Sequence, residues 1–322
     1  MARPRSAGGG AVRAARALLC VLATWACGVA AQNAPGVPDD DLRARFEQAR
    51  RQGAVQLGQR PVYLQSTETP QRLEGEVLAL IEHPMPTVRA ALAQATAWCD
   101  ILILHLNVKY GRATASPSAA QRLEVGLGRK FDEPLSSVHW LLFAFRADAP
   151  DSRGAPAAPG TAAVELRAAE GPLDTRDIRI TVQTAAAGDA RTLLRLRYAY
   201  MQGPAARWAL QLYLATVGRE KVGFSQVPDH PGAPLRTPPQ AQPVTGVRGL
   251  LERNTVRYYL AVDAYLDALD LPPAQQLERR LLDWFAGTER HPAQLRELDW
   301  ETYLQMKRLE VRRQQGTPPT RP

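Results

Sequence analysis

The sequence predicts an α+β protein in which an antiparallel sheet of about seven strands packs against one long helix near the C-terminus. Short segments of alternating apolar and polar residues fill the middle of the 322-residue chain, and such alternation is typical of half-buried antiparallel strands. After them, Leu251, Thr255, Tyr258, Val262 and Tyr265 recur at the three- and four-residue steps of one helix face. Because a helix must bury such a face, we expect it to lie on the sheet.

The N-terminal 31 residues have the pattern of a secretory signal peptide. Four arginines come first, an apolar run follows at Ala17–Ala26, and the small residues Val29, Ala30 and Ala31 offer a cleavage site. The alternative is an uncleaved membrane anchor, but the apolar run is shorter than the roughly 20 residues that span a bilayer. No later stretch is long and apolar enough to span. We therefore expect cleavage near Ala31 and a soluble mature protein that is periplasmic or secreted.

Loss of this leader changes the charge and the cysteine count. Removing its four arginines leaves 36 of the 40 basic residues against 32 acids, a net charge of +4 instead of +8. That charge is too mild to predict a nucleic-acid partner. Cys20 and Cys27 leave with the leader, so no intramolecular disulfide is expected. The remaining Cys99 could be a nucleophile, although a lone cysteine is more often a small buried hydrophobic residue.

The region before the predicted sheet is polar. Residues 32–71 are expected to form a loosely packed N-terminal arm, in which Asp40 or Asp41 caps a short helix that ends near Arg51. The core is predicted to begin near Leu73 and to extend, as one domain, over residues 72–270.

The predicted domain opens with a strand, two short helices and further strands. Leu73–Ile81 alternates at first and then becomes apolar on both faces. Pro84 and Pro86 end this strand because proline cannot continue a strand ladder. Helices are expected from Pro86 onward and over Thr96–Ile101. Turn-forming residues separate six more predicted strands, which are Leu102–Arg112, Arg122–Lys130, Val138–Ala147, Ala162–Ala169, Asp177–Thr184 and Thr192–Met201.

Helices are predicted for most of the chain after the last strand. They are Ala205–Val217, the long helix Gly246–Leu269, and a C-terminal helical extension at 271–315 that contains Ala274–Ala286 and Pro292–Arg313. Residues 226–243 are rich in proline and are predicted to form a loop. Residues 316–322 are predicted to be a disordered tail.

This order of elements resembles the START-like, or helix-grip, superfamily (SRPBCC) of polyketide cyclases and lipid-transfer proteins. The segments that carry the resemblance are LEGEVLALIEHPMPTVRAALAQATAWCDIL at Leu73–Leu102, the pair DIRITVQT and TLLRLRYAY, and the long helix. The resemblance implies a curved sheet wrapped on the long helix, with a cavity between them for an apolar ligand such as a lipid, a sterol-like molecule or an aromatic polyketide. Some members catalyse reactions in this cavity, and fold alone does not choose between binding and catalysis.

The sequence contains no strong catalytic motif. It has no G-x-S-x-G elbow, phosphate-binding glycine loop, H-E-x-x-H or paired C-x-x-C motif. The histidines lack metal-ligand spacing, and neither a metal nor a cofactor is predicted. These histidines are His83, His105, His139, His230 and His291.

Two polar clusters could meet the polar group of a ligand. Arg176 and Asp177 begin a predicted strand, where they could orient a head group, although a surface ion pair in a hairpin turn is favoured. Arg253 and Arg257 share one face of the long helix and could bind a carboxylate or phosphate inside the cavity, although a solvated helix face is favoured. Asn254 lies nearer the apolar stripe and is the preferred inward polar group.

A third cluster, His105, Asn107 and Lys109, would share one face of the predicted strand Leu102–Arg112. The apolar residues between them should face the core, so these three are expected on the surface. Tyr198 and Tyr200 would instead face the cavity.

The sequence thus favours an exported module that binds a hydrophobic small molecule or lipid. Its ligand-binding residues are predicted to be Tyr198, Tyr200, Arg253, Asn254, Arg257, Tyr258, Arg176 and Asp177. One alternative is a structural protein that docks a protein partner through its C-terminal helices. The other is an enzyme that performs acid–base chemistry on an apolar substrate in the same cavity.

Overall fold

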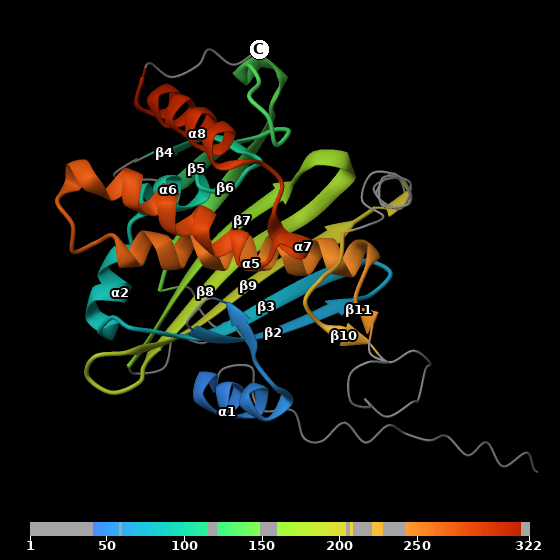
Figure 1. The fold of residues 1–322 in the computed structure, drawn as a ribbon, viewed down its shortest axis with the longest axis vertical. Coiled ribbons are helices and arrows are strands. Elements are labelled where there is room, and N and C mark those ends of the chain that lie inside the picture. Colours follow the sequence, from blue (N-terminus) through green and yellow to red (C-terminus); the bar gives the residue numbers. More distant parts are fainter. Residues whose placement is uncertain are drawn as a thin grey trace, which may run out of the picture. The chain divides into compact units, whose positions relative to one another are not determined.

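The computed structural model describes residues 41–57, 60–114, 121–148, 160–203, 207–208, 221–227 and 242–316. Within them, nine strands form one antiparallel sheet: β1 Val55–Leu57, β2 Arg60–Glu68, β3 Arg72–Ile81, β4 Val108–Thr114, β5 Arg122–Leu127, β6 His139–Ala147, β7 Thr161–Glu170, β8 Thr175–Ala186 and β9 Thr192–Gln202. Their order is β1-β2-β3-β9-β8-β7-β6-β5-β4. The helix α5 (Gly246–Asp267) crosses one face of the sheet (Figure 1). The predicted α+β helix-grip architecture is therefore confirmed.

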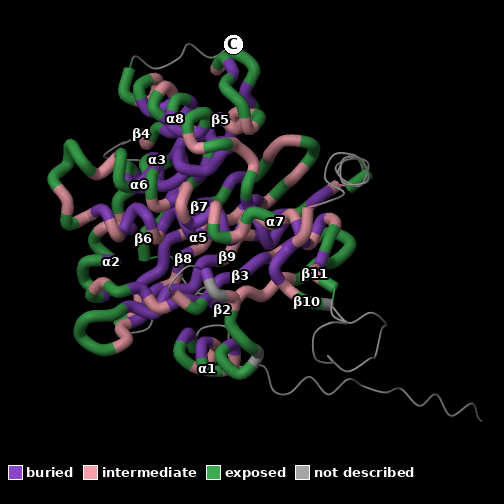
Figure 2. Tube along the Cα trace, in the orientation of Figure 1, coloured by how far each residue is buried: buried purple, intermediate pink, exposed green. Residues whose placement is uncertain are grey.

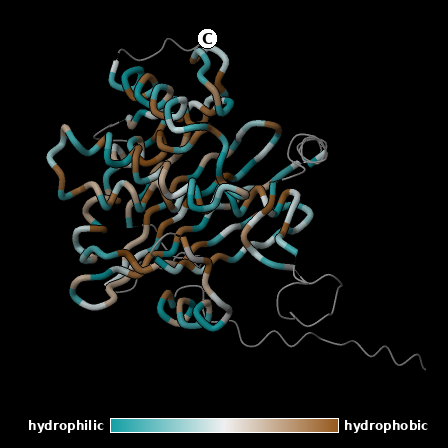
Figure 3. The backbone as a smooth tube through the Cα atoms, viewed as in Figure 1, coloured by the Kyte–Doolittle hydropathy of each residue, from teal (hydrophilic) through white to brown (hydrophobic). Residues whose placement is uncertain are grey.

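The helix α5 approaches the sheet closely because a glycine faces it. A Cβ added at Gly75 of β3 would collide with Thr255 Oγ1 of α5, so only glycine permits this separation. Leu251, Thr255 and Val262 of the predicted apolar stripe are fully buried. Figure 2 shows buried residues concentrated where α5 crosses the strands, and Figure 3 shows that much of this region is hydrophobic. The contact between helix and sheet is thus the centre of the core.

The predicted strand Leu102–Arg112 is wrong in its first half. Helix α2 (Met85–Leu92) is followed by α3 (Ala95–Leu102), and a buried turn then leads into β4 at Val108. Backbone bonds such as His105 N to Leu102 O, at 3.0 Å, hold this turn. Apolar and polar residues alternate along this turn, as they would along a strand. Both kinds are nevertheless buried, because the turn is covered on both sides.

The N-terminal arm is more ordered than predicted. Asp41 caps α1 (Leu42–Gln52) by accepting a hydrogen bond from Ala44 N, as one of the two expected capping residues. Strands β1 and β2 extend the sheet, and Val62 of β2 is fully buried. The core therefore begins before Leu73. A second small core, in which α1 packs on the sheet, contains Leu42, Phe46, Ala49, Tyr63, Leu78, Ala185 and Leu193.

The C-terminal helices pack on the same core as the sheet. Helix α6 (Pro273–Glu289) contacts α5, and α7 (Pro292–Leu295) and α8 (Trp300–Gln315) follow. The predicted single helix Pro292–Arg313 is thus interrupted, and Asp299 caps α8 by accepting from Thr302 N. Helix α8 covers the edge strand β4, where Gln314 Oε1 accepts a hydrogen bond from Gly111 N at 2.9 Å. This contact protects a sheet edge that would otherwise be free to pair.

Several predictions fall outside the described residues. They concern the signal peptide, most of the helix Ala205–Val217, the middle of the loop 226–243 and the tail after Gly316. The two ends of that loop are short paired strands, β10 (Gln226–Val227) and β11 (Gln242–Pro243). Among the helices that are described, none is both long and apolar enough to cross a membrane.

Candidate ligand cavity

A cavity of about 170 Å³ lies between the sheet and α5. Strands β4, β5, β6, β8 and β9 contribute to its wall, together with α3, α5 and the turn between β7 and β8. Its lining is mostly aliphatic or aromatic: Leu102, Val108, Val125, Leu127, Leu141, Phe143, Pro172, Leu173, Thr175, Ile178, Ile180, Tyr198, Tyr200, Gln202, Leu250 and Tyr258. We call this space the apolar cavity.

Three tyrosines form one wall of the apolar cavity. Tyr198 and Tyr200 are two residues apart on β9 and point to the same face, and Tyr258 comes from α5. The ring centroids of Tyr198 and Tyr200 are 5.5 Å apart, and those of Tyr198 and Tyr258 are 5.0 Å apart. The prediction that places these three residues at the cavity is confirmed in position, whereas ligand binding by them stays a prediction.

The tyrosine hydroxyls remain protonated at neutral pH. Burial raises the pKa of Tyr200 to about 12 and raises the pKa values of Tyr198 and Tyr258 well above their ordinary value. None of the three hydroxyls has a hydrogen-bond partner among the described residues. They can therefore donate hydrogen bonds to a ligand, but they cannot act as bases near pH 7.

Gln202 is the one amide side chain in the described lining, and it was not predicted. It is the last residue of β9 and is only 7% exposed. Neither its Nε2 nor its Oε1 has a hydrogen-bond partner among the described residues. The neighbouring Thr175, by contrast, donates its hydroxyl to Pro172 O at 2.7 Å. Strand alternation contained the relevant signal, because Gln202 continues the series Tyr198 and Tyr200 on one face.

The predicted arginines of α5 do not line the apolar cavity. Arg253 and Arg257 are buried, so the solvated helix face expected for them is also wrong. The side chain of Arg253 donates to Val222 O at 3.3 Å. Arg257 donates to Leu295 O and to Glu297, each at 3.1 Å, and Asn254 Oδ1 accepts from Arg257 at 3.3 Å. The contacts with Val222, Leu295 and Glu297 join α5 to neighbouring segments. Asn254, the predicted inward polar group, pairs within α5 and does not line the apolar cavity.

Arg176 and Asp177 also lie outside the described lining. Asp177 contacts Arg167 at 2.8 Å and Arg179 at 3.0 Å, and Arg176 pairs with Asp174 at 2.7 Å. Partial burial opposes ionisation of Asp177, but the hydrogen bonds from Arg179 and Arg167 outweigh it and lower the pKa of this carboxyl. The side chain of Arg176 is 67% exposed. The favoured prediction, a surface ion-pair cluster at a turn, is confirmed.

The prediction that His105, Asn107 and Lys109 lie on the surface is wrong. His105 and Lys109 are buried, and Asn107 is half-buried and donates to Gly128 O at 2.8 Å. The ring of His105 stacks on Tyr258 at 4.9 Å, behind the tyrosine wall. Burial, with the nearby Arg257, Lys307 and Lys109, lowers the pKa of His105 well below its ordinary value. His105 is therefore neutral near pH 7.

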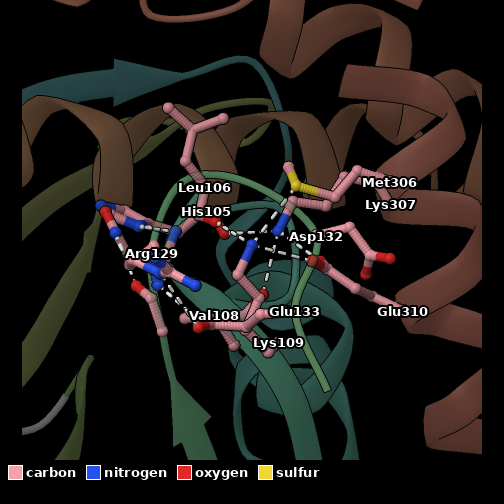
Figure 4. A network of polar contacts seen from close by, with 12 residues as sticks. His105, Leu106, Val108, Lys109, Arg129, Asp132, Glu133, Met306, Lys307 and Glu310 are labelled. Atoms are coloured by element: carbon pink, nitrogen blue, oxygen red, sulfur yellow. Dashed lines mark hydrogen bonds and ion pairs between the residues drawn. The ribbon is translucent and has the colours of Figure 1, made fainter. Parts of the chain in front are cut away.

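Lys109 belongs to a buried charge cluster with Lys307 and Glu310 of α8 (Figure 4). Its Nζ lies 2.9 Å from Glu310 Oε1, and Lys307 Nζ lies 2.8 Å from Glu310 Oε2. The side chains of all three residues have no exposed surface. Burial lowers the pKa of Lys307 to about 8, although Glu310 acts in the opposite direction. This cluster fixes α8 to the turn before β4.

A second cavity, of about 260 Å³, has a mainly charged wall. It includes Arg60 of β2, Asp263 and Asp267 of α5, and Arg279 of α6. Arg60 binds Asp263 at 2.5 Å and Asp267 at 3.2 Å. Burial raises the pKa of Asp263 to about 6 against the opposing effect of Arg60. The helix α5 thus presents different chemistry to the two cavities.

Other reactive groups are few in the described part of the chain. Burial, and next the nearby Asp100, raise the pKa of Cys99 to about 12, which agrees with a buried structural thiol and not with a nucleophile. Within the described ranges, no three His, Cys, Asp or Glu side chains converge as a metal site requires.

The strand order, the position of α5 and the cavity between them define a helix-grip fold with an apolar cavity. No protein-family model and no curated protein sequence matches the chain. Similar solved structures include norcoclaurine synthase from Thalictrum flavum, with 11% identity, a TM-score of 0.32, and coverage of 48% of this chain and 89% of that one. The helix-grip assignment rests on the topology above.

Two further structures belong to this comparison. An aromatase/cyclase from a Streptomyces species has 14% identity and a TM-score of 0.31, with coverage of 46% of this chain and 86% of that chain. Human StAR-related lipid transfer protein 5 has 12% identity and a TM-score of 0.30, with coverage of 50% and 78%.

Proposed function

We propose that this chain is an exported START-like protein, periplasmic or secreted, that binds a hydrophobic small molecule or a lipid in the apolar cavity. The observation that carries the binding proposal is the lining of this cavity, which consists mainly of aliphatic and aromatic side chains. An apolar molecule that enters such a space leaves water and gains contacts with the wall. Export is supported by the residue pattern before Ala31.

The same lining favours binding over acid–base catalysis. Among the described lining residues, the tyrosines are the only side chains with a titratable proton, and their pKa values are raised by burial. A general base should have a pKa near the working pH. The described part of the wall therefore offers hydrogen-bond donors but no base that is active near neutral pH.

Docking of a protein partner on the C-terminal helices is the weaker proposal. Arg308 and Arg313 of α8 already pair with Glu278 and Asp132 of the same chain. Lys307 and Glu310 are buried in the charge cluster. These charged side chains of α8 are therefore already paired within the chain, and nothing among the described residues indicates a surface for a second protein.

The binding proposal can be tested by filling the cavity from one side of β6. Leu141 lines the cavity, whereas its neighbour Leu142 is 43% exposed on the opposite face. Leu141→Trp should occupy ligand space and weaken binding of an uncharged apolar probe such as naphthalene, followed by its own fluorescence, by about tenfold, equivalent to about 1.4 kcal/mol. Leu142→Trp is the matched control and should bind the probe as the wild type does. Circular dichroism melts would check that both variants fold.

Equal probe binding by the wild type and Leu141→Trp would contradict the proposal. Native mass spectrometry of the gently purified wild type offers an independent measurement. A wild-type protein that neither carries nor takes up an apolar molecule would also contradict it.

A further inference from the structure

We propose that the ligand is a small uncharged molecule of one or two rings whose hydrogen-bonding group pairs with the side-chain amide of Gln202. This inference rests on the proposed function and specifies the ligand class for the same cavity. It combines three observations: the volume of the cavity, the absence of charge from its described wall, and the unpaired amide.

The volume limits the size of the ligand. The cavity measures about 170 Å³. An apolar protein cavity of about 150 Å³ accommodates benzene, whereas pockets for drug-sized molecules occupy about 300–1,000 Å³. A one-ring or two-ring molecule matches this volume, and a two-chain phospholipid exceeds it.

The wall sets the charge of the ligand. No Lys, Arg, His, Asp or Glu occurs among the described residues that line the cavity. A carboxylate, phosphate or ammonium group inside would lose its hydration without gaining an ionic partner, which is strongly unfavourable. The cations predicted from the sequence, Arg253, Arg257 and Arg176, do not line the cavity and make hydrogen bonds elsewhere. An uncharged ligand follows from this arrangement.

The amide of Gln202 sets the position of the polar group. An amide offers donors on Nε2 and an acceptor on Oε1. Here the side chain is buried, and neither atom has a partner in the part of the chain that the structure describes. Because both atoms are unpaired, this observation holds for either assignment of the amide oxygen and nitrogen. A buried polar atom without a partner destabilises the folded protein. A ligand hydroxyl can donate to Oε1 and accept from Nε2, so it would satisfy both atoms at once.

The tyrosine wall favours a ring over an alkyl chain. The rings of Tyr198, Tyr200 and Tyr258 follow one another at 5.0 and 5.5 Å on one side of the cavity. Aromatic pairs gain energy in offset or edge-to-face arrangements at such spacings. Gln202 lies two residues beyond Tyr200 on the same strand face, so a ring against these tyrosines could present its hydroxyl to the amide.

The test measures the dissociation constants of four probes with the purified protein. The probes are 1-naphthol, naphthalene, 1-naphthoate and vesicles of dioleoyl phosphatidylcholine. For the wild type, 1-naphthol should bind about tenfold tighter than naphthalene, because two net hydrogen bonds are worth about that factor. The charged 1-naphthoate should bind more weakly than naphthalene. The vesicles should transfer no phospholipid to the protein.

The variant Gln202→Leu replaces the amide side chain with an apolar side chain of similar size. It should abolish the preference for 1-naphthol over naphthalene while naphthalene binding persists within about twofold, since only the polar interaction is lost. The same change at the exposed Gln121 serves as the control and should leave the preference intact. A melting temperature for Gln202→Leu at or above that of the wild type would show that the amide has no structural role.

The outcomes separate the two proposals. A preference for 1-naphthol that persists in Gln202→Leu, or equal binding of 1-naphthol and naphthalene to the wild type, would overturn the inference and leave the proposed function standing. Tight binding of phospholipid or of 1-naphthoate in the cavity would do the same. Failure of every probe to bind would overturn both.

Discussion

The apolar cavity and the buried charge cluster both contain buried polar groups, but these groups differ in whether they have hydrogen-bond partners. In the cluster, Lys109 Nζ has three acceptors, namely Leu106 O, Met306 Sδ and Glu310 Oε1, at 2.9 to 3.3 Å. Lys307 Nζ also has three, at 2.6 to 2.9 Å. In the cavity, neither polar end of Gln202 has a hydrogen-bond partner within the described ranges. Buried polar groups that are fully paired hold a fold together, whereas unpaired ones in a cavity indicate a ligand.

The largest expected effect on stability comes from removing the charge of Glu310, which is the only carboxylate among the described contacts of the cluster. Glu310→Gln would leave Lys109 and Lys307 facing each other without a negative charge. Removing one partner of a buried ion pair typically costs about 3–5 kcal/mol. Urea unfolding should show a loss of this size in the free energy of unfolding.

The control for this variant is Glu301→Gln, on the exposed first turn of α8. A surface change of this kind should alter stability by no more than about 0.5 kcal/mol. A similar small loss in Glu310→Gln would mean that the cluster does not stabilise the fold.

A second prediction concerns the pH dependence of the cluster. The pKa of Lys307 falls from its ordinary 10.5 to about 8 in the folded protein. Between these two values, the unfolded chain keeps a proton that the folded protein has released, so the contribution of Lys307 to the free energy of unfolding rises with pH. From pH 8 to pH 10 this contribution amounts to about 2 kcal/mol.

The measurement compares urea unfolding at pH 8 and pH 10 for the wild type and Lys307→Met. The variant should lack the rise that Lys307 provides, so the stability difference between the two proteins should change by about 2 kcal/mol across the window. Lys130→Met, at a lysine that is 38% exposed, should keep the wild-type pH dependence. Parallel pH profiles for the wild type and Lys307→Met would contradict the prediction.

The smallest expected effect has the opposite sign. Because the amide of Gln202 is buried without partners, Gln202→Leu should raise the free energy of unfolding of the ligand-free protein by about 1 kcal/mol. Urea unfolding in the absence of any probe measures this value. A loss of more than about 1 kcal/mol would place Gln202 with the structural polar groups and remove the contrast with the charge cluster.

Sequence periodicity predicted the sheet well where a strand has one buried face, as β6 and β8 do. Ile178, Ile180 and Val182 alternate with polar residues, and all three are buried. Periodicity failed around His105, where a turn enclosed on both sides imitates a strand. It also missed the early strand β2, in which Val62 and Tyr63 are the only buried residues and point to opposite faces. Local patterns thus identify elements when burial is one-sided and regular.

The candidate site was predicted only in part, because the period of a single element shows which face a residue is on but not which partner it meets. Tyr198, Tyr200 and Tyr258 follow from the faces of one strand and one helix. Arg253 and Arg257 were assigned to the cavity or to solvent. Their partners Val222, Leu295 and Glu297 instead lie 31 to 40 positions away from them in the sequence. No spacing rule within α5 indicates such partners.

The sequence by itself determined the α+β class, the amphipathic helix α5 and the face of β9 that carries the tyrosines, because these depend on the period of a single element. The tertiary structure alone decided which buried polar groups are paired. Lys109 pairs with Glu310 some 200 positions later in the chain, whereas Gln202 has no partner among the residues that the structure describes. Pairing depends on distances between elements, and the packing of the whole domain sets those distances.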